Sequence, residues 1–136
     1  MVARIEPPAD QRAHGLRTLQ CSSAGHLPPL LVSPDRQVRL LTSRAERLLG
    51  IEEPRLRTDH EVAVRPGETV LLVTDGLVEA GRLDIDSGLA RLTGALRDLG
   101  GLSADALCDR LLTRVVPDRT DDDIAVLAVR VLPVRT

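Results

Sequence analysis

The stretch Val70–Glu79, which reads Val-Leu-Leu-Val-Thr-Asp-Gly-Leu-Val-Glu, decides how the rest of the chain is interpreted. Its first four residues are apolar and follow the turn signal Pro66 and Gly67, so they predict a buried strand. The strand ends abruptly in a threonine, Asp75 and Gly76. We therefore expect Asp75 to lie where the edge of a sheet opens to solvent. Because Gly76 has no side chain, it allows the backbone to approach a ligand closely.

A second stretch, Asp121–Val129, is the mirror image, with three carboxylates first and an apolar strand after them. If the two strands are antiparallel neighbours, Asp75 shares one sheet edge with Asp122 and Asp123. Close carboxylates repel each other unless a proton or a cation lies between them. Oxygen ligands of this kind favour Mg²⁺ or Mn²⁺. Each stretch alone is most often a turn or a solvated loop, but the two together predict a divalent metal site.

The remaining elements follow the order strands first, two helices next and a strand last, which is an α+β pattern rather than a βαβ repetition. Leucines at helical spacing predict one helix over 88–99, capped by Asp86 or Ser87, and a second over 103–115, capped by Ser103. A helical turn or a loop is expected at 44–49. Short apolar runs predict strands, of which the first four form an antiparallel meander, at 2–5, 16–21, 30–32, 37–41, 62–64, 69–74 and 124–132.

Composition excludes several classes of function. The net charge is −2 and the sequence contains no Phe, Tyr or Trp, so there is neither a basic footprint nor a stacking platform for nucleic acid. No signal peptide and no membrane-spanning run is visible, and we expect a cytoplasmic location with no membrane partner. Cys21 and Cys108 have no paired spacing, which favours small buried hydrophobic residues in a reducing compartment. The length of 136 residues suits one domain, residues 1–136.

An ordered set of motifs carries a family resemblance that spans about residues 16–131. The motifs are Cys-Ser-Ser-Ala-Gly-His-Leu-Pro-Pro over 21–29, Pro-Gly-Glu over 66–68, Thr-Asp-Gly-Leu-Val-Glu-Ala over 74–80, and Asp-Asp-Ile-Ala over 122–125. In this order the chain resembles the SpoIIE-like branch of the PPM-type (metal-dependent) protein serine/threonine phosphatases. That family is a β-sandwich flanked by helices. The resemblance therefore implies a part of such a sandwich, with mostly antiparallel strands and two helices before the last strand.

The chain departs from the family in one respect. The family domain has an upstream half, with a Gly-Gly-Asp stretch and an Asp-Gly stretch that supply further metal ligands, and nothing here matches them. The chain thus resembles the C-terminal portion of the domain. On the matching positions, the resemblance implies that Asp75 and Asp122 bind metal, that Gly76 accompanies Asp75 in its turn, and that Asp123 supports the site. No catalytic residue beyond these metal-site residues is implied.

The reaction implied by the resemblance is hydrolysis of a phosphoserine or phosphothreonine monoester with two Mn²⁺ or Mg²⁺ ions. Its substrate in bacterial-type signalling is a phosphorylated protein, such as an anti-anti-sigma factor. Because the upstream ligands are missing, we expect the chain alone to be weak or inactive, so whether it is an enzyme stays open. The alternative is a non-catalytic module, derived from such a phosphatase, that binds a phosphoprotein or a partner subunit.

Three further residues of the motifs have supporting roles under this reading. Gly25 serves the turn before His26. His26 is characteristic of the family motif and supports either the site or the fold, and we favour the fold because a lone histidine is usually structural. Glu79 either accepts a hydrogen bond and fixes the loop after Asp75, or is a surface carboxylate.

Overall fold

The computed structural model describes residues 1–7, 15–41, 59–118 and 122–134. Two antiparallel sheets and three helices make up the described chain, which confirms the expected α+β class. The helical turn or loop expected at 44–49 lies outside the described residues. In chain order the elements are β1 (Val2–Glu6), β2 (Arg17–Ser22), β3 (Leu30–Val32), β4 (Val38–Leu40), β5 (His60–Val64), β6 (Thr69–Val73), α1 (Asp75–Val78), α2 (Ile85–Leu99), α3 (Ala104–Val115) and β7 (Val126–Arg130).

The strands divide into a three-stranded sheet in the order β1-β2-β5 and a four-stranded sheet in the order β4-β3-β6-β7. The predicted meander of the first four strands is therefore wrong, because β2 and β3 belong to different sheets. Leu30, Leu31 and Val32 are all buried, so β3 needs cover on both of its faces. Strand β3 pairs with both β4 and β6 in the four-stranded sheet, which lies in the middle of the molecule and is covered on both of its faces.

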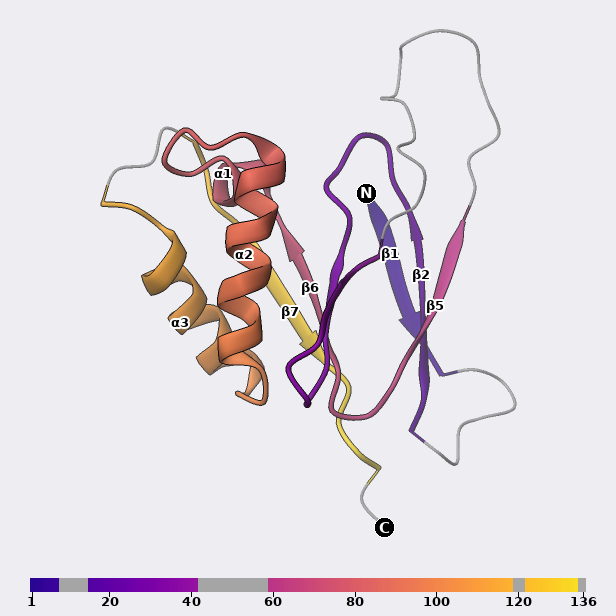
Figure 1. Cartoon of the computed structure of the whole chain (residues 1–136). Coiled ribbons are helices and arrows are strands. Elements are labelled where there is room, and N and C mark those ends of the chain that lie inside the picture. Colours follow the sequence, from indigo (N-terminus) through magenta and orange to yellow (C-terminus); the bar gives the residue numbers. More distant parts are fainter. Residues whose placement is uncertain (8–14, 42–58, 119–121, 135–136) are drawn as a thin grey trace, which may run out of the picture.

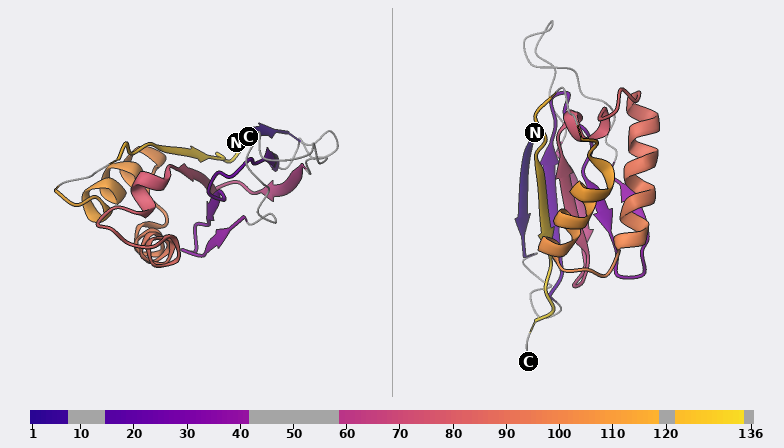
Figure 2. Two further views of the ribbon diagram at one scale, coloured as in Figure 1. Left: turned by 90° about the horizontal axis from the view of Figure 1, so that it is seen from above. Right: turned by 90° about the vertical axis from the view of Figure 1, so that its left-hand side faces the viewer.

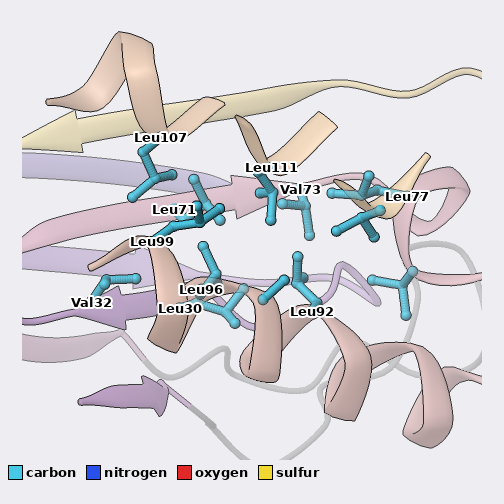
Figure 3. Close-up of a cluster of buried hydrophobic side chains, with 13 residues drawn as sticks. Leu30, Val32, Leu71, Val73, Leu77, Leu92, Leu96, Leu99, Leu107 and Leu111 are labelled. Carbon is cyan, nitrogen blue, oxygen red and sulfur yellow. The ribbon is translucent and has the colours of Figure 1, made fainter. Parts of the chain in front are cut away.

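The molecule has three layers, with helices on one side, the four-stranded sheet in the middle and the three-stranded sheet on the other side (Figure 1 and Figure 2). The larger core lies between the helices and the middle sheet (Figure 3). Its buried members are Leu30, Val32, Leu71, Val73, Leu77, Val78, Leu92, Ala95, Leu96, Leu99, Leu107, Leu111 and Val115. The smaller core joins the two sheets and contains Leu19, Leu31, Val64, Val70 and Val131. Alternate residues of β6 thus serve different cores, as the period of two in a strand requires.

The two predicted helices follow the expected pattern except at the start of α2. This helix begins three residues earlier than expected, at Ile85, because its cap is Asp84 rather than Asp86 or Ser87. The Asp84 carboxylate accepts hydrogen bonds from the backbone N–H of Ser87, at 2.9 Å, and from its hydroxyl, at 2.7 Å. These bonds lower the pKa of Asp84. Helix α3 is capped by Ser103 as predicted, since the hydroxyl accepts from the N–H of Ala106.

Other elements also differ from the sequence prediction. The last strand covers only Val126–Arg130 of the predicted 124–132. The turn expected after β6 contains one short helix, α1, which the sequence did not indicate. Within the described ranges, each helix is too short or too polar to span a bilayer.

We expect the leucine stripe of α3 to contribute strongly to stability. Leu111 is fully buried between α3 and the sheet, so Leu111→Ala should lower the free energy of unfolding by about 2–5 kcal/mol. Arg110→Ala, on the exposed side of the same helix, is the matched control and should change it by less than about 0.5 kcal/mol. Urea unfolding of both variants measures the difference. Equal midpoints would contradict the packing of α3 on this core.

Candidate metal site

Strands β6 and β7 bring the two acidic stretches to one edge of the middle sheet. They are antiparallel neighbours, and the last residue of β6, Val73, lies opposite the first residue of β7, Val126. The chain that leaves β6 therefore lies beside the chain that enters β7. This confirms that the two strands are antiparallel neighbours. It places the Asp75 turn next to the segment of Asp122 and Asp123.

Thr74 joins the two segments beyond the end of the sheet. Its N–H donates to the carbonyl of Ala125 at 3.1 Å, and its hydroxyl accepts from the N–H of Ala125 at 2.9 Å. The same hydroxyl donates to the carbonyl of Asp123 at 3.2 Å. Thr74 was not among the residues that the sequence singled out for the site. Its only signal is a hydroxyl at the end of an apolar strand, which is too common to indicate this role.

Gly76 sets how closely the two segments approach. A Cβ atom added at Gly76 would lie 2.4 Å from the carbonyl oxygen of Asp123 and 3.4 Å from the Cβ of Asp122. Only a glycine fits here, because the first of these distances is far inside van der Waals contact. The close approach expected at Gly76 is thus made by the Asp122–Asp123 segment of this chain.

The carboxylates of Asp75, Asp122 and Asp123 are exposed at this edge. One oxygen of Asp75 accepts from the N–H of Gly76 at 3.0 Å, and one oxygen of Asp122 accepts from the N–H of Asp123 at 2.8 Å. Such local bonds restrict the side-chain rotamers of the two carboxylates. Exposed carboxylates on adjoining segments suit a hard divalent cation that keeps several of its waters.

The ligand set within the described ranges is small. No group of three or more His, Cys, Asp and Glu side chains placed to hold a metal ion occurs in residues 1–7, 15–41, 59–118 and 122–134. Among the described residues, the candidate ligands at this edge are therefore the exposed carboxylates of Asp75, Asp122 and Asp123 alone. A clamp for two ions needs more carboxylates than this edge provides.

The other motif residues take part in local turns. Gly25 has a φ of +86°, a left-handed conformation that favours glycine. His26 is exposed, and one of its ring nitrogens, Nδ1, lies 2.8 Å from the carbonyl oxygen of Leu27. The backbone N–H of His26 donates to the hydroxyl of Ser23 at 3.2 Å. Glu79 is exposed, and its N–H caps α1 by donating to the carbonyl of Asp75 at 2.8 Å.

Neither cysteine offers a nucleophile for phosphoryl transfer. Burial raises the pKa of the Cys21 thiol, and the charge of Asp59 raises it further. Burial likewise raises the pKa of Cys108, with contributions from the nearby aspartates of α3. A thiol with a raised pKa is mostly protonated at neutral pH and reacts slowly. Both cysteines are free, and Cys21 is buried as the sequence analysis expected, whereas Cys108 is only half-buried.

A cleft of about 690 Å³ lies away from the acidic edge. It is lined by the β3–β4 turn, by parts of β4 and β5, and by residues such as Pro66 and Glu68 that precede β6. Asp75 follows β6, so the length of this strand separates the two places. Size alone would favour the cleft, but its lining mixes arginines with carboxylates and contains none of the residues of the candidate metal site.

Residues 13–132 match the family Stage II sporulation protein E (SpoIIE). The chain belongs to the SpoIIE family. No curated protein matches the sequence. The matched range contains both the β6 turn and the acidic segment before β7, so the SpoIIE-like resemblance seen in the motifs is confirmed.

Solved structures agree with this assignment. The RsbU and RsbW domains of Rv1364c from Mycobacterium tuberculosis share 28% identity with the chain at a TM-score of 0.68, covering 90% of the chain and 34% of that structure. The PP2C phosphatase domain of SpoIIE from Bacillus subtilis, with a fragment of its regulatory domain, is 19% identical to the chain at a TM-score of 0.61. This match covers 83% of the chain and 34% of that structure. The SiaA-PP2C domain of Pseudomonas aeruginosa is 24% identical to the chain at a TM-score of 0.61, and the match covers 88% of the chain and 48% of that structure.

These similarities establish the fold as that of PP2C domains, which are the PPM-type phosphatase domains of the sequence analysis. The chain spans about a third to a half of the length of these solved structures. The SpoIIE-family chain described here therefore corresponds to part of such a structure. What the complete proteins do is a matter of proposal for this chain.

The close contact at Gly76 leads to a stability prediction. Gly76→Ala would place a methyl group against the carbonyl of Asp123, and relief of this clash should cost about 1–3 kcal/mol of unfolding free energy. Gly94→Ala is the control, because an added Cβ in this part of α2 meets no atom within 4 Å. It should stabilise the helix by about 0.5–1 kcal/mol. Urea unfolding that shows Gly76→Ala to be as stable as the parent would contradict the contact.

Proposed function

We propose that the chain is the metal-binding C-terminal portion of a Mn²⁺- or Mg²⁺-dependent protein serine/threonine phosphatase. The single observation that supports this most is the close approach of Gly76 to the Asp122–Asp123 segment, because it joins two acidic stretches that are distant in the sequence. Membership of the SpoIIE family supports the reaction class.

The roles of the residues follow from their placement. Asp75 and Asp122 hold the cation, and Asp123 supports the segment through its carbonyl, which accepts from Thr74. Bound divalent ions supply the positive charge that activates a water and stabilises the phosphoryl oxygens, so no side-chain nucleophile is needed. In the hydrolysis, the water oxygen bonds to phosphorus and the bond to the serine or threonine oxygen breaks. That oxygen takes a proton and leaves as the hydroxyl.

The substrate proposed is a phosphorylated protein, for example an anti-anti-sigma factor in bacterial-type signalling. An exposed edge suits such a substrate, because a phosphoserine on a protein surface reaches an open site more easily than a deep pocket. Asp75 and Asp122 are both exposed, in keeping with this access.

The alternative is a non-catalytic module that binds a phosphoprotein or a partner subunit. The observation that favours it is the small ligand set, since the described residues hold no cluster of three metal-ligating side chains. Uncatalysed hydrolysis of phosphate monoesters is extremely slow, and a site with one weakly held ion would lose most of the rate enhancement. A chain that holds one ion weakly, and is therefore almost inactive, still presents the same surface to a partner.

The activity test compares three samples at matched Mn²⁺ with a phosphoserine peptide. The 136-residue chain alone should show little turnover. The chain supplied with the upstream half of a SpoIIE-type domain, in cis or as a second chain, should show Mn²⁺-dependent hydrolysis. Asp75→Asn in the supplemented sample should abolish it, because one of the ligands is lost.

Asp109→Asn, on the exposed face of α3, is the matched control and should leave the hydrolysis unchanged. Robust turnover by the chain alone that is lost in Asp75→Asn would show that the upstream half is not required. No turnover in the supplemented sample would favour the binding module instead.

A further inference from the structure

Helix α1 carries Asp75 but is too short to be stable by itself. It has four residues, Asp75–Val78, which is about one turn. Isolated helices of this length do not persist in water, since nucleation costs more than one turn returns. Its own backbone bonds are few, with Leu77 N–H donating to Thr74 and Glu79 N–H donating to Asp75. The direction of the Asp75 carboxylate therefore depends on what holds α1 from outside.

Arg91 of α2 holds the C-terminal end of α1. One guanidinium nitrogen, Nη1, donates to the carbonyl of Ala80 at 3.0 Å, and the other, Nη2, donates to the carbonyl of Leu77 at 3.1 Å. The planar fork of an arginine fixes two acceptors at once, and a charged donor makes stronger hydrogen bonds than a neutral one. Carbonyls at the end of a helix lack partners within the helix. Arg91 supplies a hydrogen-bond donor to the carbonyl of Leu77 and links this residue to the turn at Ala80.

Gly88, one helical turn before Arg91, brings the two helices into contact. A Cβ atom added there would lie 2.0 Å from the carbonyl oxygen of Val78 and 2.7 Å from a methyl group of the same residue. Positions three apart lie on one face of a helix. This face of α2 therefore contacts α1 at two points, a backbone contact at Gly88 and a hydrogen-bonded contact at Arg91.

The core side of α1 is closed as well. Leu77 is fully buried and lies at the end of the large core near Val73 (Figure 3). The acidic segment before β7 touches α1 at Gly76, and α2 holds its other end. Of these contacts, that of Arg91 is the one made by hydrogen bonds from a charged side chain. Its Nε atom is buried and has no hydrogen-bond partner among the residues that the structure describes. An apolar side chain would fill this place without burying part of a cation, so packing alone does not account for an arginine here.

We propose that Arg91 is a positioning residue for the metal site, acting through the backbone of α1 to fix Asp75. The metal part of this inference rests on the proposed function, whereas the hold on α1 does not. Both hydrogen bonds of Arg91 go to backbone carbonyls and not to a candidate ligand. Its effect passes from the carbonyls of Leu77 and Ala80 to the helix whose first residue is Asp75.

The first measurement is amide hydrogen exchange on the chain and on Arg91→Met. The N–H groups of Leu77 and Glu79 should exchange about ten to a hundred times faster in the variant, the range that the loss of a charge-assisted hydrogen bond corresponds to. The amides of β6 should be unchanged. Arg91→Lys keeps the charge but not the planar fork, so its exchange rates at Leu77 and Glu79 should lie between those of the parent and those of Arg91→Met. Arg97→Met, at an exposed position of the same helix, should match the parent.

The second measurement is Mn²⁺ binding, followed by the paramagnetic resonance signal of the free ion. Arg91→Met should weaken Mn²⁺ binding about tenfold or more, as loss of a supporting contact at a metal site does. Unchanged exchange at Leu77 and Glu79 overturns the hold on α1, and exchange that rises equally throughout the chain does so too, since it indicates global destabilisation. Faster exchange with unchanged Mn²⁺ binding overturns the positioning role. If the parent binds no Mn²⁺, or if Asp75→Asn binds Mn²⁺ as well as the parent does, the proposed function fails. The exchange result still decides whether Arg91 holds α1.

Discussion

The contact between Gly76 and the carbonyl of Asp123 is the constraint on which the acidic edge depends. Two stretches that are far apart in the sequence meet there at a distance that excludes even one methyl group. The bonds of Thr74 to Ala125 and Asp123 keep the segments in register beyond the last residues of the strands. Carboxylates on adjoining segments repel each other, and a bound cation would offset this repulsion. The rest of the chain supports this edge.

The layers explain how the edge is supported. Strand β6 lies in the middle sheet, with one face in each core, so its end is held firmly. Helices α2 and α3 cover one face of this sheet, and α2 also contacts α1, which connects the large core to the turn that carries Asp75. The three-stranded sheet covers the other face.

Much of the fold could be predicted from local sequence patterns. The apolar run of β6, the stripe of α3 and the cap at Ser103 each depend on residues close together in the chain. The partition of strands between two sheets could not, because pairing of β3 with β6 joins stretches some forty residues apart. The start of α2 was misjudged for a smaller reason. Asp84 and Ser87 both suit a helix cap, and their mutual hydrogen bonds decide which of them takes it.

The candidate site shows the same division. Asp75 and Asp122 were found because each stands beside an apolar strand. Thr74 and Arg91 were not, since a threonine hydroxyl and a helical arginine take their meaning only from partners that folding brings near. Helix α1 was missed because Asp-Gly after a strand favours a turn, and its helical form depends on contacts with α2.

The central claim is that Asp75 and Asp122 hold one divalent cation together. The most direct measurement is a titration of the isotope-labelled chain with Mn²⁺, in which the paramagnetic ion broadens the resonances of nearby amides. The account predicts that Gly76 and Asp123 broaden first and together, while amides of the β3–β4 turn, such as that of Asp35 beyond the other end of the middle sheet, stay sharp. Broadening that persists in Asp75→Asn or in Asp122→Asn, or that follows exposed carboxylates throughout the chain, would contradict it.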